Sequence, residues 1–66
     1  MFKEYDVVQL TRDLDNRLRA GTRGTVLMVY DGNPPEYEVE FVSEDGETLA
    51  LKTIEESQIE KAPTSM

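Results

Sequence analysis

The chain has 66 residues with no cysteine and no histidine, so it can form one small domain without disulfides or thiolate metal sites. The lack of histidine also removes the commonest general base and the commonest metal ligand. A net charge of −7 argues against nucleic acid and anionic membranes as partners, because both are negatively charged, and it fits a basic or neutral partner.

The first predicted elements are a short strand and a long loop. Residues 5–10 are rich in apolar side chains and predict a strand, in which Val8 and Leu10 share one face because side chains alternate. Residues 11–20 are polar and charged and predict a long loop. Two leucines four residues apart in this loop are expected to fold back onto the rest of the domain.

A glycine turn and a second strand follow the loop. Gly21 and Gly24 suit a turn that needs a positive φ angle at one or both positions. Residues 25–30 are β-branched and aromatic without a clean period, so they predict a strand that is buried on both faces or bent midway. Residues 31–35 combine Asp-Gly with two prolines and predict a turn.

The clearest pattern in the chain is a strand over residues 37–41, where apolar and acidic side chains alternate. One face of this strand is therefore expected to join the core and the other to meet water. The inward residues are Tyr37, Val39 and Phe41, and the outward residues are Glu38 and Glu40. The Asp45-Gly46 pair that follows predicts a hairpin turn. Residues 48–53 then predict the returning strand, with Leu49 and Leu51 together on one face.

The last elements are a short turn and a short strand. Residues 54–57 predict a 3₁₀ turn, and residues 58–61 predict a final strand with Ile59 inward. Five strands, a long first loop and a 3₁₀ turn before the last strand are typical of a small all-β SH3-like barrel. We therefore expect one such domain over residues 1–61 and a disordered tail over residues 62–66.

Four segments together resemble a small bacterial family of stand-alone domains that is labelled only as being of unknown function: residues 5–10, 20–26, 37–41 and 45–48. Members of that family are similar in size and acidity. Some are encoded beside a larger, toxin-like protein, which implies that the small domain is a neutralising partner. The glycine turn also resembles the opening of ribosomal and transcription-factor SH3-like modules, but those modules are basic and this chain is acidic.

Six acidic residues gather around the predicted hairpin and are the candidate partner-binding residues: Glu36, Glu38, Glu40, Glu44, Asp45 and Glu47. Acid–base catalysis requires two carboxylates in contrasting environments, and acids that alternate along a wet strand face do not supply that contrast. The spacing of the acids in the turn matches no EF-hand loop. We therefore expect no enzymatic activity, no metal site and no cofactor.

The acidic hairpin supports two interpretations. Like charges two residues apart repel one another, so a basic partner would relieve a cost that the free domain bears. The same charges can also serve only to keep a small domain soluble. Lys52, on the returning strand, can relieve part of the repulsion within the fold.

Four arginines make the first loop the basic part of the molecule: Arg12, Arg17, Arg19 and Arg23. Arg17, Arg19 and Arg23 are secondary candidates for binding a carboxylate or a phosphate. The nearer partners are Asp13 and Asp15 of the same loop, so intramolecular ion pairs are the simpler interpretation.

The sequence thus predicts a non-catalytic protein-binding module. We expect a cytoplasmic location, because no signal peptide and no membrane-spanning segment is evident. Its most concrete form is an antitoxin-like or immunity-like partner that presents the acidic hairpin to a basic cleft of a larger protein. The first alternative is a small assembly subunit that forms a strand-edge or face-packed homodimer and so buries the apolar side chains of Leu27, Met28 and Val29. The second is a nucleic-acid-binding SH3-like module that uses the arginine loop, which the net charge disfavours.

Overall fold

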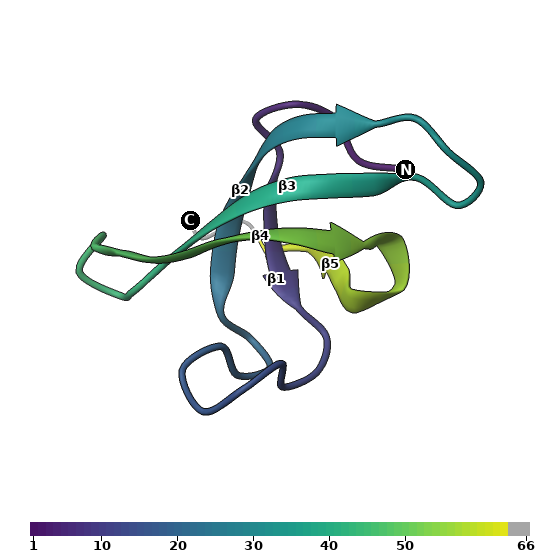
Figure 1. Ribbon diagram of the computed structural model, residues 1–66. Helices are drawn as coiled ribbons and strands as arrows, with labels where there is room; N and C mark the ends of the chain where they lie inside the picture. The colour runs from purple at the N-terminus through teal and green to yellow at the C-terminus, as the bar shows by residue number, and fades with distance from the viewer. Residues whose placement is uncertain (64–66) are drawn as a thin grey trace.

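The computed structural model describes residues 1–63 and contains five strands and one short 3₁₀ helix (Figure 1). In chain order these are β1 (Val7–Leu10), β2 (Arg23–Tyr30), β3 (Glu36–Val42), β4 (Thr48–Glu55), η1 (Glu56–Gln58) and β5 (Ile59–Lys61). The predicted all-β class, the five strands, the long first loop and the 3₁₀ turn before the last strand are confirmed. Residues 64–66 of the predicted tail lie outside the described residues.

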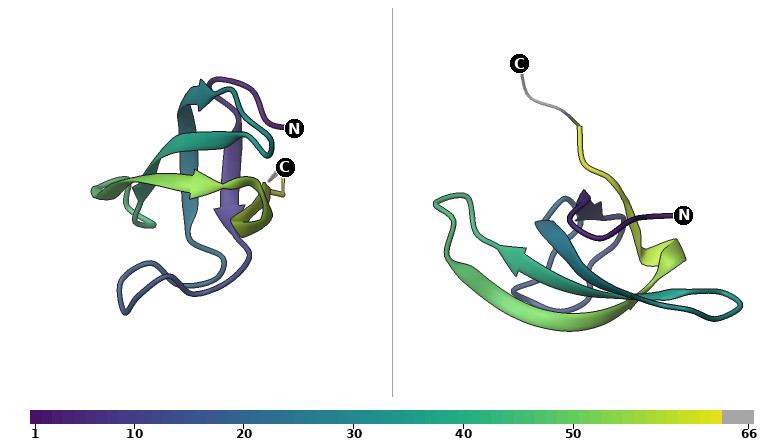
Figure 2. Two further views of the ribbon diagram at one scale, coloured as in Figure 1. Left: turned by 45° about the vertical axis from the view of Figure 1, so that its right-hand side comes forward. Right: turned by 90° about the horizontal axis from the view of Figure 1, so that it is seen from above.

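The strands form one antiparallel sheet in the order β4-β3-β2-β1-β5. The sheet is strongly curved, so that β3 and β4 cross in front of β1 (Figures 1 and 2). The prediction of a barrel is wrong, because the sheet is not closed: within residues 1–63, β4 pairs only with β3, and β5 pairs only with β1. β5 has three residues and makes no ladder with β4, so both strands remain sheet edges.

The core lies on the inner, concave side of the sheet. Its nine buried side chains are Val8, Leu10, Leu18, Val26, Tyr37, Val39, Phe41, Ile54 and Ile59. The inward faces predicted for the first, third and last strands are therefore confirmed. Leu18 comes from the long loop, and Leu14 packs against the same cluster, so both loop leucines do fold back onto the sheet. The loop contributes to the core as well as connecting β1 to β2.

Two bulges interrupt the alternation of side chains. In β2 the register against β3 shifts between Val26 and Met28, which accounts for the missing period of this strand. In β4 the register shifts across Leu49, so that Ala50 lies opposite Phe41. Leu51 is consequently opposite Glu40 on the outer face, and the prediction that Leu49 and Leu51 share a face is wrong.

The two glycines of the first turn have different roles. Gly21 has a φ angle of +89°, a conformation that residues with a Cβ atom rarely adopt. Gly24 is buried within β2, and a Cβ atom there would lie 2.6 Å from Val39 Cγ1 and 2.9 Å from Phe41 Cδ1. The absence of a side chain at Gly24 thus lets β2 and β3 approach closely over the core.

Tyr37 joins the N-terminal segment to the 3₁₀ helix. Its ring is fully buried and meets the ring of Phe2 edge to face, with centroids 5.4 Å apart. The hydroxyl accepts a hydrogen bond from the Phe2 N–H (3.1 Å) and donates one to Glu56 Oε1 (2.6 Å). Burial raises the pKa of Tyr37, and the hydrogen bond to Glu56 adds to this effect by favouring the protonated phenol.

Candidate functional site

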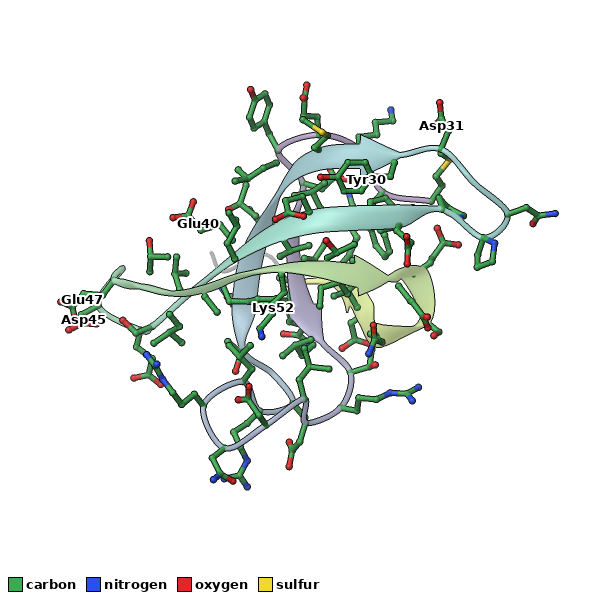
Figure 3. The ribbon with its side chains drawn as sticks, viewed as in Figure 1. Tyr30, Asp31, Glu40, Asp45, Glu47 and Lys52 are labelled. Atoms are coloured by element: carbon green, nitrogen blue, oxygen red, sulfur yellow. The ribbon has the colours of Figure 1, made fainter. Side chains whose placement is uncertain are left out.

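The structure divides the six candidate acidic residues between a sheet face and a turn. Three lie on the outer face of β3, opposite the core, and we call them the acidic row: Glu36, Glu38 and Glu40. The other three lie in the connection between β3 and β4: Glu44, Asp45 and Glu47. Figure 3 shows Glu40 on the sheet, with Asp45 and Glu47 at the tip of the turn.

The turn between β3 and β4 is built by Ser43. Its N–H donates to the Glu47 carbonyl (2.8 Å), its carbonyl accepts from the Gly46 N–H (2.9 Å), and its Oγ accepts from the Glu47 N–H (3.1 Å). The Ser43 hydroxyl also donates to the Asp45 carboxylate. Asp45 therefore helps to shape the turn, and Gly46 adopts the positive φ angle (+89°) that closes it.

Two carboxylates of the acidic row accept hydrogen bonds from threonine hydroxyls of β4. Glu38 Oε1 accepts a hydrogen bond from the Thr53 hydroxyl (2.9 Å), and Glu40 Oε2 accepts one from the Thr48 hydroxyl (2.6 Å). The Tyr30 hydroxyl of β2 approaches the same oxygen of Glu38 at 3.4 Å. Desolvation at the sheet surface raises the pKa of Tyr30, and the negative charge of Glu38 adds to this effect. Both carboxylates thus have hydrogen-bond partners on β4, and Glu38 has a second one on β2.

The acidic row has no counter-charge within residues 1–63. The ion pairs in this part of the chain join Arg19 to Asp13 (3.3 Å) and Lys61 to Asp6 (4.0 Å). Glu36 instead lies directly opposite Glu55 in the register of β3 against β4. Like charges in that position are destabilising, so this face is not optimised for folding alone.

Lys52 does not lie beside the acidic row. It is opposite Val39, whose side chain is in the core, and Figure 3 shows it projecting away from Glu40. Its positive charge makes a minor contribution to the lowered pKa of Asp15 in the long loop, after the backbone hydrogen bonds of Arg17 and Leu18. The neutralisation expected of Lys52 is therefore absent on the outer face.

Exposed apolar side chains flank each member of the acidic row. On β2, Met28 lies opposite Glu38, and its side chain is 50% exposed. On β4, Leu51 lies opposite Glu40 and is 55% exposed. Tyr30 occupies the corresponding place beside Glu36. The outer face thus combines negative charge with accessible apolar surface, which is typical of binding surfaces. The sequence did not predict Leu51 on the outer face, because the bulge in β4 places it there.

The three tyrosines do not line one groove. Tyr37 lies in the core, and Tyr30 lies on the outer face at 40% exposure. Tyr5 precedes β1 and is 71% exposed, with a φ angle of +72°. An aromatic groove of the kind that binds proline-rich peptides is therefore not assembled from these residues.

The acidic residues of the long loop have structural partners. Asp15 Oδ1 accepts hydrogen bonds from the N–H groups of Arg17 (2.8 Å) and Leu18 (2.9 Å), and these bonds lower the pKa of Asp15. Asp13 forms the ion pair with Arg19. The intramolecular pairing predicted for the loop is thus present for Arg19, whereas Arg17 contributes its backbone N–H.

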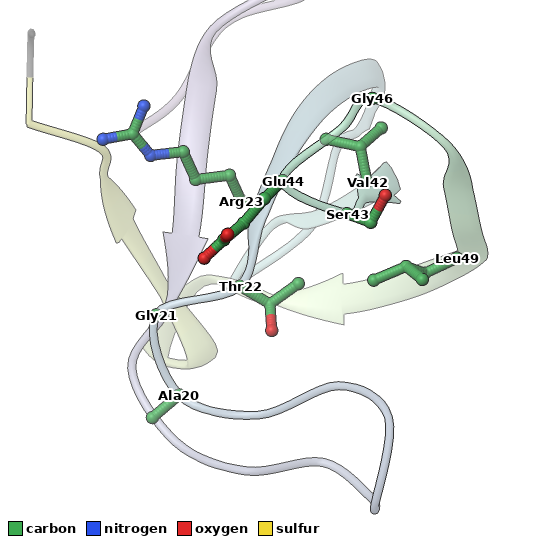
Figure 4. Close-up of a pocket in the computed structure, with 9 residues that line it drawn as sticks. All are labelled: Ala20, Gly21, Thr22, Arg23, Val42, Ser43, Glu44, Gly46 and Leu49. Carbon is green, nitrogen blue, oxygen red and sulfur yellow. The ribbon is translucent and has the colours of Figure 1, made fainter.

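A shallow cavity of about 830 Å³ lies between the end of the long loop and the β3–β4 turn (Figure 4). Arg23, the third candidate arginine, lies on β2 at this cavity, and Glu44 lies across from it on the turn. The guanidinium of Arg23 donates to the Pro63 carbonyl (3.4 Å). The cavity therefore presents both signs of charge, and the structure does not gather the three candidate arginines on one element.

Within residues 1–63, no group of three or more acidic side chains is arranged to hold a metal ion. No helix in this part of the chain has the length and apolar character needed to cross a membrane. No curated protein and no solved structure matches the chain. A family model described as "Domain of unknown function (DUF4926)" matches residues 4–61, which is most of the sequence. The chain therefore belongs to the DUF4926 family.

Proposed function

We propose that this domain is a non-catalytic protein-binding module whose outer face binds a basic surface of a larger protein. The observation that carries the proposal is the acidic row, which is flanked by Met28, Tyr30 and Leu51 and has no counter-charge within residues 1–63. A basic partner would relieve the repulsion in the row and cover the apolar side chains.

The geometry of the acids supports binding rather than catalysis. Glu38 and Glu40 occupy similar half-exposed positions on one strand, and each accepts a hydrogen bond from a threonine hydroxyl. Acid–base chemistry would instead need one of two carboxylates in a contrasting, desolvated environment. An antitoxin-like or immunity-like domain that occupies a basic cleft is the most concrete form of this function, as the family resemblance implies.

Affinity capture from the host cell tests the proposal. The tagged domain is compared with an E38K/E40K variant and with an E4K/D31K variant. The E4K/D31K variant has the same net charge as E38K/E40K but leaves the acidic row intact. We expect a basic partner that the wild type and the control retain at low salt, that high salt releases, and that E38K/E40K does not capture. Equal capture by all three proteins would contradict the proposal. A column without partner, together with sedimentation as an oligomer, would favour the self-associating subunit.

A further inference from the structure

The edge of β4 is the longest free hydrogen-bonding edge of the sheet. β4 spans eight residues and pairs on one side only, with β3, whereas the opposite edge strand β5 has three residues. Within residues 1–63, no backbone hydrogen bond from a loop or turn reaches residues 48–54. The middle of the strand, at residues 51–53, is exposed. A free strand edge of this length can accept an additional strand.

The acidic row brings its charge toward this free edge. The carboxylates of Glu38 and Glu40 start on β3 and accept hydrogen bonds from Thr53 and Thr48 of β4, although the same oxygen of Glu38 also accepts one from Tyr30 of β2. Glu55 adds a third carboxylate at the end of β4, where its side chain also belongs to a capping box with Gln58 at the start of η1. Because neighbouring strands are about 4.8 Å apart, the long side chains of a strand added beside β4 could reach these carboxylates.

We infer that the β4 edge binds an extended segment of the partner that carries lysine or arginine at alternate positions. The segment would continue the sheet, and its basic side chains would lie on the outer face beside the acidic row. This inference rests on the proposed function and specifies the partner as an extended basic strand rather than a folded surface in general. Backbone hydrogen bonds would supply affinity, and the alternating charges would supply register.

Lys52 adds a second element of recognition. It is exposed at the middle of β4 and belongs to the inner-face register, opposite Val39. A residue of the added strand beside Lys52 is therefore expected to be acidic or polar, while its neighbours on the outer face are basic. A second copy of this chain does not meet this requirement well, because each copy has a net charge of −7 and its β4 would bring Glu55 toward the same acidic face.

A short acetylated and amidated peptide of alternating threonine and lysine is the probe for this edge. When such a peptide lies along a strand edge, the N–H groups of its lysines point to one side and those of its threonines to the other. Two further peptides carry N-methyl groups on all lysine amides or on all threonine amides. The charge stays the same in the three peptides, but only one methylated peptide loses the N–H groups that face β4.

We expect the parent peptide to slow hydrogen exchange in the NMR spectrum of the intact protein at those amides of residues 48–55 that point away from β3. One methylated peptide should bind like the parent and the other at least about tenfold more weakly. The E38Q/E40Q variant should bind the parent about tenfold more weakly, while the matched E4Q/D31N variant should not differ from the wild type.

Three results would overturn the inference. The first is equal binding by both methylated peptides with shifts confined to the outer-face side chains, which would leave the proposed function intact and move the contact to the sheet face. The second is no binding of the parent peptide while affinity capture still yields a salt-sensitive partner that depends on Glu38 and Glu40. The third is slowed exchange, in the protein alone, at the amides of residues 48–55 that point away from β3, with dimerisation in sedimentation, which would identify a second copy as the occupant.

Discussion

Glu36 of β3 lies directly opposite Glu55 of β4, and no positive charge within residues 1–63 forms an ion pair with either. A cross-strand pair of like charges destabilises a sheet by up to about 1 kcal/mol, which is a noticeable fraction of the stability of a small domain. This pair of glutamates therefore opposes folding in the free protein. The proposed binding role would account for this cost, because a basic partner would relieve the repulsion.

Replacing one member of this pair should stabilise the isolated domain. We expect Glu36→Lys to raise the free energy of unfolding by about 0.2–1 kcal/mol at low salt, because it converts a repulsive cross-strand pair into an attractive one. Urea denaturation at low and high salt measures the change, and high salt should reduce it. Glu4→Lys alters the net charge equally at an exposed site outside the sheet. An equal gain in both variants would assign the effect to net charge alone.

Gly24 should not tolerate even a methyl group. In Gly24→Ala the new Cβ atom would lie 2.6 Å from Val39 Cγ1 and 2.8 Å from the Glu40 carbonyl oxygen. Such overpacking is expected to cost about 1–3 kcal/mol of unfolding free energy. Because Val39→Ala removes the nearest atom, the loss from Gly24→Ala should be smaller in that background when both are measured by urea denaturation. A loss that does not depend on Val39 would show that the contact is relieved in another way.

The long loop should contribute to stability through Leu18. Its side chain is 1% exposed, so Leu18→Ala should lower the free energy of unfolding by about 2–5 kcal/mol. Leu14 is only partly buried against the same cluster, and Leu14→Ala should cost clearly less. Thermal unfolding followed by circular dichroism compares the two variants. Similar melting temperatures for both would contradict a specific role for Leu18.

The buried hydroxyl of Tyr37 should make the domain sensitive to alkali. Its pKa in the folded state is raised above the ordinary value of about 10, mainly by burial, so the folded state retains the phenolic proton more strongly than the unfolded chain does. The contribution of the protonated Tyr37 hydroxyl to the free energy of unfolding is therefore fully present below pH 10 and is lost as the pH rises through the pKa of the folded state. Tyr37→Phe should lower the free energy of unfolding by about 1 kcal/mol at neutral pH. Above pH 10, the free energy of unfolding of this variant should fall less steeply than that of the wild type. An unchanged alkaline slope in this variant would refute the assignment.

The alternating pattern of the third strand was sufficient to predict its structure. Tyr37, Val39 and Phe41 are in the core and Glu38 and Glu40 are outside, because a sheet with one wet face enforces a period of two. The positions of the turns were also predictable, since they depend on local conformational preferences such as the positive φ angle at Gly46.

Features that depend on pairing between strands were not predictable from the sequence. The bulge at Leu49 reverses the face of Leu51, and nothing in the local composition indicates it. The open edge of β4 likewise results from the length and pairing of β5, which is a property of the whole sheet. For the candidate site, the sequence was enough to name the acids as candidates, whereas their apolar neighbours and their hydrogen bonds to the threonines of β4 required the structure.

The most direct test of the account is the dissociation constant of the captured partner, measured by titration calorimetry with the wild type, E38K/E40K and the charge-matched E4K/D31K at low and high salt. We expect E38K/E40K to weaken binding at least about tenfold at low salt, E4K/D31K to change the affinity little, and high salt to reduce the difference in affinity between the wild type and E38K/E40K. Equal weakening by both variants would contradict it, because the outer face would then contribute only net charge.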